Sequence, residues 1–541
     1  MKNFILSKLK ANWKSGLTVS LVSIPLSVSL AVASHASPVM GIVTAVWAGL
    51  IASFFGGSNF NIVGPTGALS GILATYAIAH GQGALAVLAI ISGVLILLAY
   101  LFHLERYLVF VPGSAIHGFT LGVAFIIGLN QLNFALGLTG LKSQEKFIEN
   151  VIQSFVHIGS ASFLSVMIFL LSLLVLFLFK KFVPRLPGAI VLAPVGILFG
   201  YLTANNFLPL AIQTLDSIYP NIHLALFLPY KFSVDSSILV PAFAVALVAI
   251  LETMISAKIA DGMTKTKYNQ RQEMSGLALA NIASGLMGGM PATAALARTS
   301  LNVKTEANDK ISATISSISV AIISLFLLGY FKYIPLPVIA AILVFVAIQM
   351  VEAEHFKRMF KFDRTNFYVS VVVAFVTIYE DPIVGIMFGV AISSIILLEK
   401  ISRGQFDLVL NDKHRMIGHV SGEYLQKTVK GSDTVVYSTR GMLCYINCEA
   451  HLNRIQDRLK GAKNIILRLR SVYYIDMDGV ETIDEIIRSV QAKGIKIFIT
   501  GVSPIVAEML NESAAYRELI EKGMVFEHST QALTSLGFKL N

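Results

Sequence analysis

Long apolar segments with few charged residues recur along the first four hundred residues of this chain. A helix needs about 20 predominantly apolar residues to cross a bilayer. Twelve segments approach that length, namely residues 16–34, 39–55, 84–102, 111–134, 161–182, 188–202, 238–260, 274–289, 311–330, 334–351, 366–379 and 383–398. Because backbone at membrane depth must satisfy its own hydrogen bonds, this pattern predicts an α-helical polytopic membrane protein.

The composition changes near Arg403. The whole chain is 55% apolar and only 14% charged, with a net charge of +10, whereas soluble proteins carry about 25% charged residues. Residues 1–403 contain 25 basic and 16 acidic residues, while the last 138 residues contain 17 and 16. We therefore predict a transmembrane domain over residues 1–403 and a cytoplasmic domain over residues 404–541. A cytosolic enzyme, a disordered chain and a secreted disulfide scaffold are excluded.

No catalytic motif is visible in the sequence. Cys444 and Cys448 are its only cysteines, so no disulfide or zinc framework is predicted. We find no metal-ligand cluster, phosphate-binding loop or nucleophile constellation. The basic charge does not indicate nucleic-acid binding, because it is concentrated in connections between apolar segments. We therefore predict neither an enzyme nor a resident cofactor.

Two further apolar segments, residues 65–79 and 291–303, are too short to span comfortably. Glycine-rich breaks precede both, Gly56-Gly57 with Gly64-Pro65 in one case and Gly288-Gly289 in the other. They are the third and tenth of fourteen segments, which predicts a 7+7 inverted repeat over about 14–205 and 237–400. Paired short segments of this kind indicate a transporter binding site, although glycine and proline are also common in ordinary membrane helices.

The distribution of basic residues predicts the orientation. With the N-terminus inside, the cytoplasmic connections carry 20 Lys and Arg residues and the outside connections carry four. Cytoplasmic loops of membrane proteins are enriched in these residues. We therefore expect a multi-pass protein of a plasma membrane, of the bacterial inner-membrane type, with both termini in the cytoplasm.

A half-helix that begins inside the membrane suits an anion. Its first N–H groups lack intrahelical partners and its dipole is positive there. The predicted substrate-binding residues are those around the two starts: Thr66, Gly67 and Ala68, and then Thr293, Ala294 and Ala295 after Ala292. Residues 59–63 are extended in character, which predicts short strands that cross between the two breaks.

Ionisable residues at membrane depth are functional candidates. Glu252 lies in an apolar span, and burial favours the neutral form of a carboxyl, so it is a candidate to exchange a proton or, with Ser256, to hold Na⁺. A structural hydrogen-bond acceptor is the alternative. Arg298 follows the second half-helix start and is expected to contact the anion, to pair with Glu252 or to extend toward the cytoplasm. Pro25 is the remaining predicted substrate-binding residue: it is expected to kink the first span beside the site, so that this helix contacts the anion, or to serve packing alone.

These residues resemble those of the sulfate permease (SulP/SLC26) anion transporters along the whole chain. The resemblance lies in Ile24-Pro25-Leu26-Ser27, Gly64-Pro65-Thr66-Gly67-Ala68, Glu252 with residues 256–264, and Gly288-Gly289-Met290-Pro291 with Ala297-Arg298-Thr299. It implies a UraA/SLC26-like fold of core and gate domains, a homodimer and an elevator-like movement. Members move sulfate, bicarbonate, chloride or dicarboxylates, some with H⁺ or Na⁺. Leu26 replaces a glutamine that many members carry.

The tail alternates strand-like and helical runs, which predicts a small α/β domain. Strands are expected at 434–438, 441–446, 464–469 and 495–500, and helices at 450–459 and 477–490. The tail resembles a STAS domain. In the related anti-sigma antagonists, a serine or threonine of one loop is phosphorylated. The same loop here contains Met477 and Asp478, so phosphoserine switching is not expected. The domain is expected to serve structure and dimer contacts, or to bind a nucleotide or partner.

Three functions remain open at this point. The first is secondary transport of a small anion, of the sulfate, bicarbonate or dicarboxylate class, by an elevator-type mechanism with H⁺ or Na⁺ as the coupling ion. The second is an anion-sensing signalling protein with the STAS domain as its output, or an uncoupled exchanger or channel. The third is a nucleobase symporter, against which Arg298 and the tail argue. The expected partners are the anion, the lipid bilayer and a second copy of the chain.

Overall fold

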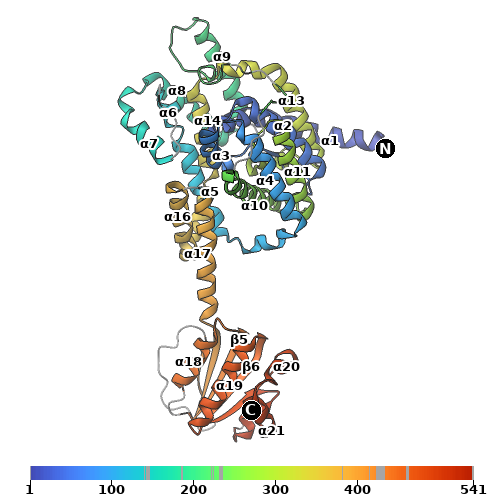
Figure 1. The fold of residues 1–541 in the computed structure, drawn as a ribbon, viewed down its shortest axis with the longest axis vertical. Helices are drawn as coiled ribbons and strands as arrows, with labels where there is room; N and C mark the ends of the chain where they lie inside the picture. The colour runs from blue at the N-terminus through green and yellow to red at the C-terminus, as the bar shows by residue number, and fades with distance from the viewer. Residues whose placement is uncertain are drawn as a thin grey trace. The chain divides into compact units, whose positions relative to one another are not determined.

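The structure of the chain is a computed structural model. It describes residues 2–538 apart from 139–140, 142–146, 184–186, 221, 223–224, 231–235, 381, 413–414, 422–432 and 459–461. The chain divides into two compact units, Met1–Ser393 and Ser394–Asn541 (Figure 1). The division lies inside helix α17 (Pro382–Ser402), whereas the sequence places a domain boundary at Arg403, just after that helix ends.

Helices make up almost all of the first unit. Its first half contains α1 (Lys2–Ala33), α2 (Pro38–Phe55), α3 (Gly67–His80), α4 (Ala84–Leu101), α5 (Gly113–Leu129), α6 (Leu132–Leu136), α7 (Phe147–Val156), α8 (Phe163–Phe182) and α9 (Ala189–Ala204). Its second half contains α10 (Leu239–Thr264), α11 (Gln270–Leu286), α12 (Leu296–Lys304), α13 (Ile311–Leu327), α14 (Leu336–Met350), α15 (Ala353–Phe362), α16 (Arg364–Tyr379) and α17. Short 3₁₀ helices lie at Leu104–Phe110, Ile158–Ser160, Leu215–Ser217, Ser236–Ile238 and Leu328–Tyr333.

Each of the fourteen predicted segments coincides with a helix. Among the described residues, nine helices are long and apolar enough to cross a membrane, and Gly67–His80, Ala189–Ala204 and Arg364–Tyr379 are shorter apolar helices. The helical membrane fold is therefore confirmed. That all fourteen segments enter the bilayer stays a prediction.

Helix packing follows the predicted repeat. Helix α2 packs against α13 as α11 packs against α4, and α1 contacts α13 as α10 contacts α4. In the same way α5 packs against α16 as α14 packs against α8. In each comparison, the second pair consists of the helices that occupy the equivalent positions in the other half of the unit. Equivalent helices therefore make equivalent contacts, as expected for a two-fold internal repeat.

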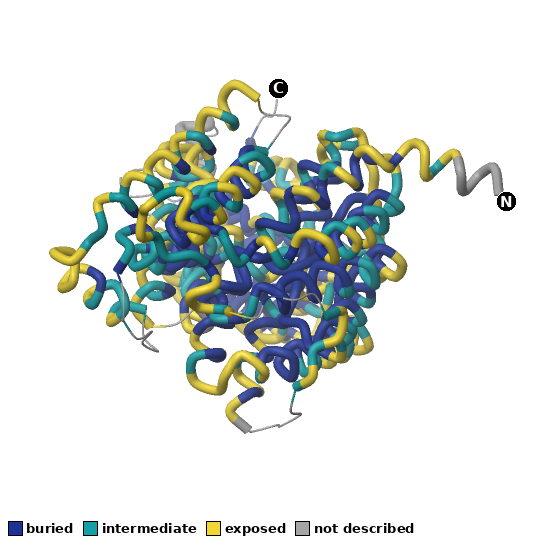
Figure 2. Tube along the Cα trace, turned by 90° about the horizontal axis from the view of Figure 1, so that it is seen from above, coloured by how far each residue is buried: buried dark blue, intermediate teal, exposed yellow. Residues whose placement is uncertain are grey.

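The contacts also sort the helices into two groups. Helices α1, α2 and α4 pack mainly with one another and with α10, α11 and α13, whereas α5, α6 and α8 pack mainly with α14 and α16. Helix α3 contacts both groups, through α10 and α5, and α9 contacts α1 as well as α14. The first group is the more enclosed: 72% of the apolar window of α1 is buried, against 17% for α8. In Figure 2 the buried segments of the chain lie mostly inside and the exposed segments mostly at the periphery. The two groups correspond to the expected core and gate domains.

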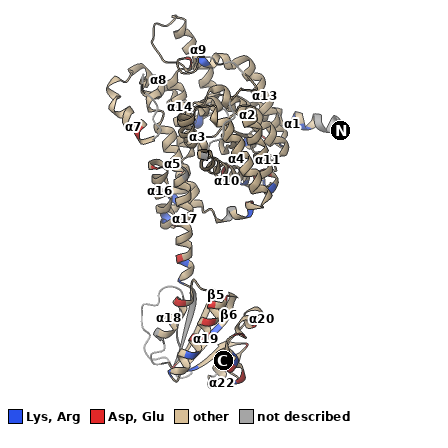
Figure 3. Cartoon of the chain, viewed as in Figure 1, with Lys and Arg blue, Asp and Glu red and all other residues tan. Residues whose placement is uncertain are grey.

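Charged residues are distributed unevenly over the two units. In Figure 3, Lys, Arg, Asp and Glu are sparse along the helices of the first unit and more frequent in the second. This agrees with the composition, because a surface that faces lipid does not require charge whereas a surface in water does.

The second unit is an α/β domain with a six-stranded sheet in the order β4-β3-β5-β6-β7-β8. Its strands are β3 (Gln405–Asp412), β4 (Arg415–Ser421), β5 (Thr434–Leu443), β6 (Asn464–Ile475), β7 (Lys496–Thr500) and β8 (Val525–Phe526). Its helices are α18 (Cys448–Arg458), α19 (Met477–Ala492), α20 (Pro504–Leu510), α21 (Ala514–Glu521) and α22 (Ser529–Ser535). Strands β5 to β8 are parallel, whereas β3 is antiparallel to β4 and β5.

One detail of the predicted sheet is wrong. The strands expected at 434–438 and 441–446 form the single strand β5. Gly441 has a positive φ of 89°, and the register with β6 shifts on either side of it. Glycine adopts this conformation without steric cost, so a bulge within one strand looked like a break between two. The hairpin of β3 and β4 was not predicted.

Candidate functional site

A two-residue antiparallel ladder joins the two halves of the membrane unit. Strand β1 (Val63–Gly64) pairs with β2 (Thr293–Ala294), with Val63 opposite Ala294 and Gly64 opposite Thr293. The predicted short strands between the two breaks are therefore confirmed. Each strand leads within three residues into a short helix, so one ladder positions both helix starts.

Neither of these helix starts is capped by a side chain. Helix α3 has Thr66 and α12 has Ala295 at the N-cap position, without a capping hydrogen bond in either case. The first N–H groups of both helices therefore remain available, at the positive end of each dipole. The prediction that the second half-helix begins at Ala292 is wrong, because α12 begins at Leu296.

The residues before α12 use their N–H groups within the protein. The N–H of Ala294 donates to Thr253 Oγ1 at 3.1 Å, and that of Ala295 donates to the Ile62 carbonyl at 3.2 Å. The Thr253 and Thr293 hydroxyls are 2.8 Å apart. These bonds hold β2 in place and leave the first turn of α12 itself as the group of free donors.

The two helix starts differ in accessibility. In the first turn of α12, Ala297 is exposed. The equivalent turn of α3 is buried at Gly67 and Ala68, and a Cβ on Gly67 would lie 2.9 Å from Ile127 and 3.0 Å from Met350. The start of α12 is therefore the less covered of the two, whereas helices α5 and α14 cover the start of α3.

Glu252 on α10 is linked to the first half-helix. The Thr66 hydroxyl donates to Glu252 Oε2 at 3.1 Å. The Glu252 side chain is only partly buried, so a proton or cation can reach it even though it lies within an apolar helix. The predicted carboxyl is thus placed beside the positive end of α3.

Arg298 bridges the two half-helices. Arg298 belongs to α12 and is only 2% exposed. Its Nη2 donates to the carbonyl of Pro65, just before α3, at 2.5 Å. Its Nη1 is buried without a hydrogen-bond partner, and a Cβ on Gly64 would lie 2.8 Å from that nitrogen. The side chain therefore does not extend toward solvent, and it adds a fixed positive charge to the two dipole ends.

Glu252 and Arg298 interact through space rather than by direct pairing. No ion pair of 4 Å or less joins them among the described contacts, although both lie close to the start of α3. A buried guanidinium with one unpartnered nitrogen is costly unless another group satisfies it. An anion between the helix ends would supply such a group.

Ser256 lies one turn after Glu252 but is engaged elsewhere. It is fully buried, and its hydroxyl donates to Thr299 Oγ1 at 2.9 Å. Thr299 in turn accepts the N–H of Ile62 at 3.2 Å. This chain of bonds ties α10 to α12 and to the approach of β1. The role of Ser256 as a Na⁺ ligand stays a prediction.

Pro25 lies inside α1 and is buried. The hydroxyls of its neighbours Ser23 and Ser27 are buried without hydrogen-bond partners, and Leu26 packs against a cluster that includes Ile62. Helix α1 therefore passes close to the strand that carries the site, and a contact between Pro25 and the anion stays a prediction.

Several residues that the sequence did not single out support the site. Glu273 accepts the N–H groups of Gly57 and Ser58, both at 2.7 Å, and the amide of Asn61 at 2.6 Å. Asn281 holds both the N–H and the carbonyl of Ala292, at 2.9 and 3.0 Å. Polar residues buried in apolar helices are the signal that would have found them.

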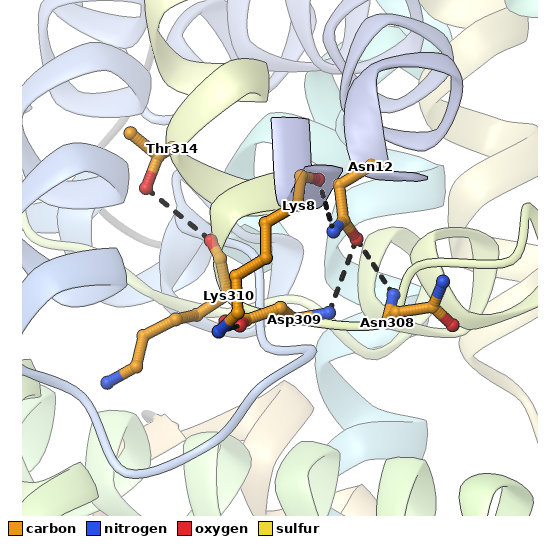
Figure 4. A network of polar contacts seen from close by, with 6 residues as sticks. All are labelled: Lys8, Asn12, Asn308, Asp309, Lys310 and Thr314. Carbon is orange, nitrogen blue, oxygen red and sulfur yellow. Dashed lines mark hydrogen bonds and ion pairs between the residues drawn. The ribbon is translucent and has the colours of Figure 1, made fainter. Parts of the chain in front are cut away.

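A second network anchors the other end of α12. Asn12 Oδ1 accepts the N–H groups of Asn308 and Asp309, at 2.8 and 3.2 Å, and Lys8 forms an ion pair with Asp309 (Figure 4). The Thr314 hydroxyl bonds the Lys310 carbonyl nearby. The loop between α12 and α13 is thereby fixed to α1, so α12 is held at both ends.

In the second unit, Asp476 caps α19 at the loop where phosphorylation was considered. Its carboxylate accepts the N–H of Gly479 at 2.9 Å and that of Tyr445 at 3.1 Å. Deeper in this unit, Tyr437 Oη and His451 Nδ1 lie 2.8 Å apart, and burial lowers the pKa of His451 to about 4. His451 is therefore neutral near pH 7 and acts as a core hydrogen-bonding group.

The sequence profile of the sulfate permease family matches residues 9–373. The chain belongs to this family. The profile of the STAS domain matches residues 424–532. Both assignments agree with the geometry described above.

Among similar proteins is the putative sulfate transporter YvdB of Bacillus subtilis (strain 168), which is 28% identical over 532 residues, 97% of this chain and 98% of its own. The bicarbonate transporter BicA of Picosynechococcus sp. is 23% identical over 420 residues, covering 73% of this chain and 71% of BicA. Its membership of the sulfate permease family, supported by these relatives, identifies the chain as an anion transporter of the sulfate permease type.

The fold is shared with solved structures. The murine anion transporter Slc26a9 in the inward-facing state superposes with a TM-score of 0.82 at 15% identity, covering 97% of this chain and 91% of that one. The transmembrane domain of a cyanobacterial BicA gives 0.61 at 21% identity, over 71% and 97%. At these identities the likeness concerns the fold alone, which is therefore SLC26-like and carries a C-terminal STAS domain.

Proposed function

We propose that this sulfate permease family member is a secondary active transporter of a small anion, of the sulfate, bicarbonate or dicarboxylate class. The observation that carries the proposal is the pair of uncapped half-helix starts on one ladder, with Arg298 bridging them. Backbone donors and a guanidinium suit an oxyanion that accepts several hydrogen bonds. The substrates named for YvdB and BicA support this class.

The hydrogen bond between Thr66 and Glu252 suggests how a cation is coupled. An ionised carboxylate at the start of α3 weakens the binding of an anion at the same positive helix end, since like charges repel. A proton on Glu252 removes that opposition, so anion and proton bind together and travel in the same direction. Na⁺ at Glu252 and Ser256 would neutralise the charge in the same way.

The ladder also supports an elevator-type movement. Both half-helices are fixed to it, and α12 is held by Asn281 and by the network around Asn12. The helices that carry the site can therefore move together against α5 and α14, which cover Gly67. We further propose a homodimer in a plasma membrane of the bacterial inner-membrane type, with both termini in the cytoplasm.

Flux into liposomes tests this function. The purified full chain is reconstituted, and uptake of labelled sulfate, bicarbonate and fumarate is measured with and without a pH gradient and a Na⁺ gradient. We expect one gradient to concentrate one of these anions. In Glu252→Gln we expect the gradient to lose its effect, because the side chain can no longer gain or lose charge. Asp261→Asn, further along α10, is the matched control.

Each contrary result selects a different function. Flux that no gradient changes indicates an uncoupled exchanger or channel and removes the coupling role of Glu252. Anion-dependent partner binding by the STAS domain without flux indicates a sensor. If the reconstituted protein moves no anion under any gradient, the transport proposal is wrong.

A further inference from the structure

Three side chains with metal-ligating atoms meet where α5 begins and α14 ends. His117 lies in the second turn of α5, Glu352 lies between α14 and α15, and His355 lies in the first turn of α15. One ligand atom from each lies within 4.8 Å of the other two. Glu352 and His355 lie more than two hundred residues after His117 in the chain, so no local sequence pattern joins the three.

The geometry of this cluster is close to that of a coordination site. His117 Nδ1 is 3.5 Å from a Glu352 carboxylate oxygen, and the His117 and His355 rings have centroids 3.9 Å apart at 30°. Ligand atoms on one tetrahedral Zn²⁺ lie roughly 3.4 Å apart, given metal–ligand distances of about 2.0–2.2 Å. The separation of His117 and Glu352 already matches this spacing, and all three ligand atoms lie within 4.8 Å of one another.

The ligand atoms are not committed to other groups. Among the described contacts, none of the three side chains makes a hydrogen bond, and their polar interactions are with one another. The side chain of His117 is 23% exposed and that of Glu352 is 44% exposed, so an ion can enter from solvent. By contrast, the ring of His103 in the same unit contacts Arg271.

We propose that His117, Glu352 and His355 bind one divalent transition-metal ion of the Zn²⁺ class, with water completing the coordination. Two imidazoles and one carboxylate form a donor set that suits Zn²⁺ and its neighbours rather than Mg²⁺ or Ca²⁺, which prefer oxygen ligands. The three residues come from two separate segments, so the ion joins the start of α5 to the connection between α14 and α15.

This position gives the ion a mechanical role that rests on the proposed transport function. Met350 lies two residues before Glu352 and covers Gly67 at the start of α3. An ion that fixes the connection after Met350 stabilises this cover. Zn²⁺ should therefore slow any movement of α3 past α5 and α14, and with it the anion flux.

Binding is tested on the full chain in detergent, after removal of metal with a chelator. Titration with Zn²⁺, followed with a competing chromophoric chelator, should give one ion per chain, and Co²⁺ should produce visible absorption bands of a site with nitrogen and oxygen ligands. Mg²⁺ should not compete. We expect His355→Ala and Glu352→Gln each to weaken Zn²⁺ binding at least about tenfold, with His157→Ala, an exposed histidine, as the matched control.

Two results would overturn the site. One is a wild-type protein that binds no Zn²⁺, and the other is equal binding by wild type and His355→Ala when both elute as single species in gel filtration. In liposomes, Zn²⁺ should slow wild-type flux and leave His355→Ala unaffected, and equal slowing of both refutes the mechanical role. If neither protein moves an anion, the transport proposal fails while the Zn²⁺ titration still decides the metal site.

Discussion

The starts of α3 and α12 share one backbone arrangement but differ in burial and in the charge of the neighbouring side chain. Both follow a strand of one ladder, and both lack a side-chain cap. The start of α3 is buried and its Thr66 is bonded to an acid, Glu252. The start of α12 is open at Ala297 and carries a base, Arg298. The repeat thus supplies two similar dipole ends, and the side chains place an acid beside one of them and a guanidinium beside the other.

The two helices also differ in what holds them. Helix α12 is fixed by Asn281 and Thr253 before its start and by the network of Asn12 after its end. The start of α3 is covered by Ile127 and Met350 from α5 and α14, which belong to the other group of helices. One dipole end is therefore fixed within its own group, while the other lies at the boundary between groups.

Removal of the Arg298 charge should have the largest effect. Arg298→Gln leaves only partial backbone charges for the anion, and truncation of a buried, hydrogen-bonded charge costs about 2–5 kcal/mol. We expect anion flux to fall at least about 100-fold. Arg298→Lys should retain more flux, since it keeps a charge but not the planar fork. Arg271→Gln, an exposed position, is the control, and full flux in Arg298→Gln would give Arg298 a structural role alone.

A methyl group on Gly64 should have the next largest effect. Its Cβ would lie 2.8 Å from Arg298 Nη1, so the guanidinium or the ladder must shift. We expect Gly64→Ala to lose about 1–3 kcal/mol of unfolding free energy and to reduce flux about tenfold. Gly262→Ala is the matched control because nothing lies within 4 Å of its Cβ position. Equal flux in both variants would show that the position of Arg298 is not critical.

The same substitution at equivalent positions tests the difference in accessibility. Ala68 and Ala297 are each the second residue of their half-helix, but only Ala297 is exposed. Ala68→Leu should overpack a buried position and cost about 1–3 kcal/mol in thermal unfolding. Ala297→Leu should change stability by less than about 0.5 kcal/mol and weaken anion binding instead. Matching stability losses would remove the contrast between the two starts.

Removal of the Thr66 hydroxyl should have the smallest effect on anion flux. Thr66→Val removes the hydroxyl that donates to Glu252, and a hydrogen bond of this kind contributes about 0.5–1.5 kcal/mol. We expect flux to fall by less than about tenfold, while Thr66→Ser, which keeps the hydroxyl, stays near wild type. The comparison is read from uptake rates in liposomes. A serine variant as slow as the valine variant would show that the threonine methyl group matters more than its hydroxyl.

Sequence patterns predicted the elements of the site better than its contacts. Apolar length and the glycine-rich breaks located α3, α12 and the crossing strands, because these depend on local composition. The start of α12 was misplaced by a few residues, since Ala294 pairs with a strand from the other half of the chain. Partners such as Glu273 for Asn61, or Glu352 for His117, are joined only by the fold, and no local pattern encodes them.

The ladder between β1 and β2 couples the opening of the two repeats. Val63 pairs with Ala294 and Gly64 pairs with Thr293. At these positions the backbone of each repeat shields that of the other from solvent. Amide protons that bond across this ladder can exchange with solvent only when the two repeats separate there, whereas the Ala294 N–H donates to Thr253 within its own repeat. The exchange rate of the cross-ladder amides therefore reports how often the two repeats come apart at the site, and it should stay slow through the proposed movement, in which the ladder remains paired.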